Sequence, residues 1–95
     1  MSDANPKNKL VRSETWQAVR KSLLGQWKKR PEWCCSQLRS YLGSISTADK
    51  DKLKVVQNYL TGTGFRTGLI KHPCISALRN EISEERKRRV SKNAW

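Results

Sequence analysis

The clearest helical pattern in the chain lies in residues 13–30, SETWQAVRKSLLGQWKKR. Its apolar residues recur with the spacing of one helical face, at Trp16, Val19, Leu23, Leu24 and Trp27. Ser13 is suited to cap the amino end, because its hydroxyl can accept from the first free backbone N–H groups. The pattern predicts a helix that continues to about Lys29. Gly25 inside it costs about 1 kcal/mol relative to alanine, which a close helix contact or an early helix end would explain.

Proline and glycine divide the rest of the chain. Pro31 suits the first turn of a second helix, which we expect to end at Leu42 before Gly43. A third helix is expected to start at the cap-like run 46–49 and to close at Gly62.

The segment from Thr61 to Pro73 is rich in glycine and has no helical period, so we expect a basic loop there. Pro73 then opens a fourth helix, whose apolar stripe fades after Ile82. In the charged part, Glu84 and Glu85 precede Arg88 and Arg89 by four residues, the favourable order for ion pairs on one helix.

The predicted fold is all-α: a small bundle of three to four short helices with a glycine-rich basic loop and a disordered N-terminal arm. We divide the chain into a disordered basic arm (1–12), a single helical domain (13–90) and a flexible tail (91–95). Ninety-five residues allow one modest core and no second domain.

Charge is the most informative property for function. Twenty Lys and Arg residues against eight Asp and Glu give a net charge of +12, which favours a polyanionic partner. Nucleic acid is the commonest polyanion, while a soluble domain that is merely basic is the plain alternative. No apolar run is long enough for a membrane span, and no helix is suited to lie on a membrane surface. Three cysteines cannot all pair within one chain, so we expect reduced thiols and a cytoplasmic location, with association with the nucleoid as a further option.

The predicted nucleic-acid contacts are the less compensated cations of four basic clusters. The Lys50–Lys54 cluster alternates with Asp49 and Asp51, and we interpret it as a solvated helix face. The remaining candidates are Arg20, Lys21, Lys28, Lys29, Arg30, Arg66, Lys71, Arg86, Arg88 and Arg89. The last three follow the final apolar anchor of their helix, so we expect them to contribute little to folding. We assign Trp16 and Trp27 to the core, whereas Trp33 could be packed or available to a base.

The sequence offers no convincing catalytic or metal-binding set. Cys34, Cys35, His72 and Cys74 are the right residue types for zinc, but adjacent helical residues point about 100° apart and do not readily share one ion. We expect Cys34 in the core and Cys35 partly exposed. A Cys–His nucleophile at 72 and 74 is disfavoured by their separation around a proline. We therefore expect neither an enzyme nor a cofactor.

The composition and helical pattern favour a non-catalytic protein that binds double-stranded DNA. RNA or ribonucleoprotein binding is the first alternative, and a module that regulates or inhibits an acidic protein partner is the second. The glycine-rich loop, the helix begun by Pro73 and the basic tail resemble parts of phage packaging or mobile-element accessory proteins, which implies a regulatory or accessory role. The sequence leaves the oligomeric state open.

Overall fold

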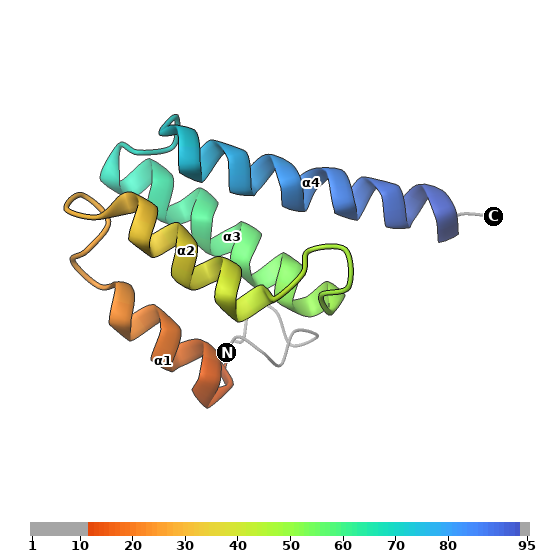
Figure 1. Ribbon diagram of the computed structural model, residues 1–95, viewed down its shortest axis with the longest axis horizontal. Helices are drawn as coiled ribbons and strands as arrows, with labels where there is room; N and C mark the ends of the chain where they lie inside the picture. The colour runs from red at the N-terminus through yellow and green to blue at the C-terminus, as the bar shows by residue number, and fades with distance from the viewer. Residues whose placement is uncertain (1–11, 94–95) are drawn as a thin grey trace, which may run out of the picture.

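The computed structural model describes residues 12–93, with the side chains of residues 12–90. It contains four helices and, over these residues, no strand: α1 (Glu14–Leu23), α2 (Pro31–Leu42), α3 (Lys50–Thr67) and α4 (Pro73–Asn93). In Figure 1, α3 runs antiparallel to α2 and α4, while α4 follows the direction of α2 and extends beyond it. The prediction of a small all-α bundle is confirmed. The predicted arm lies outside the described residues apart from residue 12, and α4 continues into the predicted tail.

One core joins the four helices, with the closest packing between α3 and α4 and between α2 and α4. Its fully buried side chains are Leu23, Cys34, Leu38, Leu53, Val56, Leu60, Ile75, Leu78 and Ile82. These residues follow the apolar stripes of the sequence, since burying one stripe per helix is what stabilises short helices. No helix among the described residues is both long and apolar enough to cross a membrane.

The first helix ends earlier than predicted. Ser13 caps α1 as expected, accepting from the Trp16 backbone N–H at 3.1 Å. The helix stops at Leu23, because Gly25 adopts a left-handed backbone with φ +73° that favours glycine. Leu24 therefore lies 72% exposed instead of on the apolar face, while Trp27 reaches the core from the loop.

The second helix has the predicted bounds and stops before Gly43, which also has a positive φ. The third begins later than predicted, with Asp49 as its cap accepting from the Asp51 backbone N–H at 2.9 Å. Its end differs most from expectation: the helix continues through both Gly62 and Gly64 and stops at Gly68. The predicted loop over 61–73 is therefore wrong in its first half, and only residues 68–72 connect α3 to α4.

Gly64 has a packing role inside α3 and does not end the helix. A Cβ at this position would lie 2.6 Å from Ile70 Cδ1 and 3.0 Å from Ile70 Cα, so the returning chain packs directly on the helix backbone. In the same turns, Thr67 donates its hydroxyl hydrogen to the Thr63 carbonyl at 2.7 Å. Because glycine has no side chain, the segment that carries Ile70 can pack closely against the backbone of α3 at residue 64.

Candidate nucleic-acid interface

A cleft of about 360 Å³ opens between the end of α1, the loop that follows it and the last turns of α3. Figure 1 shows that loop and the end of α3 at the same end of the bundle. We call this cleft the basic cleft. Its lining residues are Gln17, Arg20, Lys21, Leu24, Gly25, Trp27, Lys28, Tyr59, Thr63, Arg66 and Thr67.

Aromatic residues fix the wall of the basic cleft. Trp27 donates its indole N–H to the Tyr59 hydroxyl at 2.8 Å, and their rings lie 6.0 Å apart. On its other side, Tyr59 meets Trp16 edge to face at 5.3 Å. Because these contacts join α1, the following loop and α3, they hold the two halves of the cleft together. The prediction that Trp16 and Trp27 belong to the core is confirmed.

Four of the ten predicted cations line the basic cleft: Arg20, Lys21, Lys28 and Arg66. All four are exposed, and no lining residue is Asp or Glu. Arg20 Nη1 lies 3.3 Å from Gln17 Oε1, and Arg66 Nη2 donates to Thr63 Oγ1 at 3.1 Å. These neutral partners orient the guanidinium groups and leave their positive charge uncompensated by the lining residues.

Three more predicted cations are exposed outside this lining. Lys29 and Arg30 follow Lys28 in the same loop, and Lys71 lies in the connection between α3 and α4. The Arg30 guanidinium sits 4.0 Å from the centroid of the Trp33 ring, a cation–π contact that covers one face of this tryptophan. The ring is half-buried as well, so Trp33 is packed in part by its own neighbouring cation.

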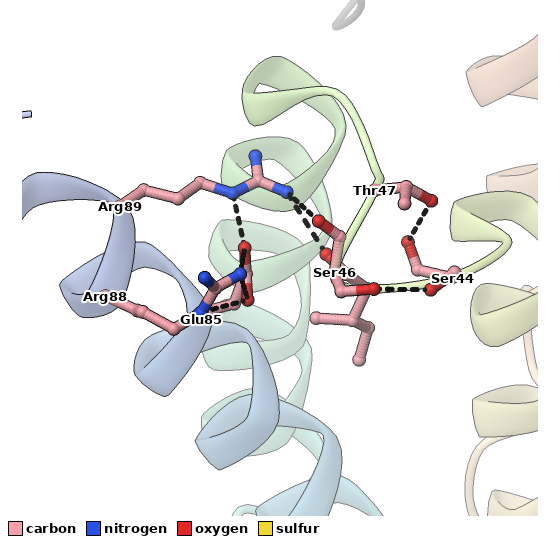
Figure 2. Close-up of polar contacts among 7 residues, drawn as sticks. Ser44, Ser46, Thr47, Glu85, Arg88 and Arg89 are labelled. Carbon is pink, nitrogen blue, oxygen red and sulfur yellow. Dashed lines mark hydrogen bonds and ion pairs between the residues drawn. The ribbon is translucent and has the colours of Figure 1, made fainter. Parts of the chain in front are cut away.

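The last three predicted cations, Arg86, Arg88 and Arg89, are engaged with the protein itself, and Figure 2 shows the contacts of Arg88 and Arg89. Arg88 Nη2 and Arg89 Nε lie 2.7 and 2.6 Å from carboxylate oxygens of Glu85, whose side chain is only 8% exposed. Arg89 also donates to the Ile45 and Ser46 carbonyls, both at 3.2 Å. We call this arrangement the α4 clasp, because it ties α4 to the loop between α2 and α3.

Two members of this run, which were expected to project into solvent and contribute little to folding, make contacts with other segments. Arg89 is 25% exposed and bonds to a segment more than forty residues away, while Arg86 donates to Gln57 Oε1 on α3. Arg88 is 54% exposed and stays closer to the expected solvated state. Arg88 was predicted to pair with Glu84. In the structure both Arg88 and Arg89 donate to the carboxylate of Glu85.

A second ion pair, which the sequence did not reveal, joins α2 to α4. Arg39 Nη1 donates to Glu81 Oε1 and Arg39 Nη2 donates to Glu81 Oε2, both at 2.8 Å. This bidentate contact lowers the pKa of Glu81. The pKa of Glu85 is likewise lowered by its hydrogen bonds to Arg88 and then Arg89. Glu81 and Glu85 of α4 thus pair with nearby arginines, away from the basic cleft.

None of the three cysteines is in a disulfide, and Cys34 and Cys35 are both buried. The prediction of a partly exposed Cys35 is wrong, because the face of α2 that packs on α4 includes it. Within the part of the chain that the structure describes, no group of three or more His, Cys, Asp or Glu side chains is arranged to hold a metal ion. His72 and Cys74 contact each other instead, with Nδ1 and Sγ 3.1 Å apart.

Several lining residues of the basic cleft were not identified from the sequence. Thr63 and Thr67 fall where a loop was expected, and Tyr59 was assigned only to the apolar stripe of α3. A usable signal existed: residues 15–31 and 52–80, which together supply the whole lining, contain no Asp or Glu. Comparison with known proteins gives no match to any family model, curated protein or solved structure.

Proposed function

We propose that this protein binds double-stranded DNA without catalysing a reaction, and that the basic cleft is the centre of its contact with the phosphate backbone. One observation carries the proposal: exposed cations from α1, its following loop and α3 converge on one concave surface whose lining lacks acids. Such a surface attracts a polyanion, and each neutralised phosphate releases counterions. We also propose that the protein acts in the cytoplasm, where thiols are kept reduced. A phage or mobile-element accessory role stays a prediction.

The decisive experiment removes charge from the basic cleft alone. The variant carries Arg20→Gln, Lys21→Gln and Arg66→Gln, three changes on exposed side chains. Binding to a duplex is measured by fluorescence anisotropy across a salt series. If each cation meets one phosphate, the slope of log K against log salt becomes shallower by about 2.7, and affinity at 0.1 M salt falls on the order of 100-fold.

A matched control removes the same charge elsewhere. Lys50→Gln, Lys54→Gln and Lys87→Gln also lower the net charge by three, but none of these lysines lines the basic cleft. We expect this variant to lose much less affinity than the cleft variant. Equal losses in the two variants would mean that the total charge, and not the basic cleft, determines binding. No binding of the parent protein to duplex DNA, single strands or structured RNA at low salt would favour an acidic protein partner.

RNA is the second candidate, and one specific observation favours it. Phe65 is 68% exposed in the last turns of α3, beside Arg66. An exposed aromatic ring next to a cation can stack on an unpaired base. If RNA or another single strand is the ligand, Phe65→Ala weakens its binding by about tenfold while duplex binding changes little. An unchanged affinity for single strands would remove the argument for this candidate.

A further inference from the structure

A cluster of thiols lies where α2 and α4 begin. Cys34 and Cys35 are in the early turns of α2, and Cys74 is the second residue of α4. His72 precedes that helix, and its Nδ1 accepts the Cys74 backbone N–H at 3.2 Å. The same nitrogen lies 3.1 Å from Cys74 Sγ. The backbone contact corresponds to the tautomer with the ring proton on Nε2, in which the one lone pair of Nδ1 is shared between the backbone N–H and the thiol hydrogen of Cys74.

The faces of α2 and α4 that carry Cys35 and Cys74 pack against each other. Arg39, four residues beyond Cys35 on α2, forms its bidentate contact with Glu81, seven residues beyond Cys74 on α4. Farther along, Arg89 bonds to the loop that follows α2. These contacts run in the same order on both segments, so α2 and α4 pack in parallel. At the start of this alignment the Cys35 and Cys74 thiols lie close enough to interact.

The three thiols differ in what surrounds them. Burial raises the pKa of Cys34 to about 11. Burial and the contact with Cys74 also raise the pKa of Cys35. Both therefore remain protonated at neutral pH. Cys74 is half-buried and has an imidazole nitrogen within reach of its proton.

We infer that Cys74 and Cys35 form a peroxide-reactive thiol pair, in which His72 activates Cys74 and Cys35 completes a disulfide. Cys74 sulfur attacks one oxygen of hydrogen peroxide as its proton passes to His72 Nδ1. The O–O bond breaks, and the leaving hydroxide takes that proton as water, leaving a sulfenic acid on Cys74. Cys35 sulfur then attacks Cys74 sulfur, the S–O bond breaks, and a second water leaves with the Cys35 proton. Two thiols are oxidised and one peroxide is reduced to two waters.

The product would join the start of α2 covalently to the start of α4. Pro73 and the short connection carrying Lys71 directly precede Cys74. The cross-link would therefore fix this connection against α2. The chemistry does not require nucleic acid, so it stands or falls separately from the DNA-binding proposal.

The test treats the full-length reduced protein with hydrogen peroxide, blocks the remaining thiols by alkylation and maps the peptides by mass spectrometry under non-reducing conditions. We expect a peptide pair joined through Cys35 and Cys74, lighter by two hydrogens and absent after reduction. A pair joined through Cys34, a cross-link between two chains only, or oxidation without any disulfide would each overturn the proposal.

Three variants separate the roles, with far-UV circular dichroism to show that each is folded. Cys35→Ser should lose the disulfide and accumulate Cys74 sulfenic acid, which dimedone traps. Cys34→Ala, the matched control, should form the disulfide like the parent protein. His72→Gln should slow Cys74 oxidation by at least about tenfold, whereas an unchanged rate would refute the role of His72. Because the parent protein alone gives a readable result, a variant that fails to fold leaves the inference testable.

Discussion

Two glycines of α3 should respond to alanine with opposite signs. Gly62 and Gly64 both lie inside the helix, two residues apart. A Cβ at Gly62 would meet nothing within 4 Å, whereas a Cβ at Gly64 would lie 2.6 Å from Ile70 Cδ1 and 3.0 Å from Ile70 Cα. The side chain of Ile70 can rotate away, but its backbone can move only if the chain leaving α3 shifts. The two positions thus have the same helical backbone conformation but differ in the atoms that surround them.

The magnitudes follow from this difference. Alanine in a helix interior is more favourable than glycine by about 1 kcal/mol, so Gly62→Ala should raise the free energy of unfolding by that amount. At Gly64 the same gain is opposed by overpacking, which costs about 1–3 kcal/mol. Gly64→Ala should therefore lower the free energy of unfolding by about 1 kcal/mol. The two variants should differ by about 2 kcal/mol, which corresponds to roughly 10 °C in Tm for a chain of this size.

Thermal unfolding followed by circular dichroism at 222 nm measures both variants against the parent protein. The expected order of Tm is Gly62→Ala, then the parent, then Gly64→Ala. A lower Tm for Gly62→Ala would refute the reasoning, because it would show that residue 62 is not in a helix. Equal shifts at the two positions would also contradict it, since the contact with Ile70 would then be absent.

Two further predictions concern the α4 clasp. Arg89→Ala should lower the free energy of unfolding by about 2 kcal/mol, because its charged hydrogen bonds are lost. Lys87→Ala, an exposed change in the same turn, should change this free energy by less than about 0.5 kcal/mol. Urea unfolding measures both variants, and similar values for the two would show that the α4 clasp contributes nothing. The lowered pKa of Glu85 means that its contribution to stability is complete above the unfolded value of 4.5 and is lost as pH falls through the folded value. Tm should therefore fall between about pH 5 and pH 3, and Glu85→Gln should weaken this dependence; an identical pH profile in the variant would refute the assignment.

Helix positions were predictable wherever local chemistry determined them. Ser13, Pro31 and Pro73 mark helix starts, because a capping hydroxyl or a preset φ acts within one turn. The ends of α1 and α3 were harder to predict, because a glycine has two opposite uses. Gly25 turns the chain with a positive φ, whereas Gly64 stays helical since Ile70 needs the space. Only the three-dimensional contact distinguishes these uses.

The candidate site was predictable residue by residue but not as an assembly. Arg20, Lys28 and Arg66 were all identified by their charge, yet nothing local shows that α1 and the end of α3 lie together. The contact that joins them, from Trp27 to Tyr59, spans thirty-two residues. The α4 clasp was not predicted for the same reason. Arg89 bonds to the backbone carbonyls of Ile45 and Ser46, and every residue has such a carbonyl, so the sequence does not distinguish these two.

The two basic regions differ because of where the acids fall. Glu81 and Glu85 lie on α4 and pair with arginines of α2 and α4, so much of the charge there is neutralised and serves the fold. The segments 15–31 and 52–80 hold no acid at all, and the fold brings them together around the basic cleft. Four exposed cations of these segments therefore line the basic cleft with no acid beside them in the lining. This concave arrangement of cations without acids is the reason we expect a polyanion to bind at the basic cleft.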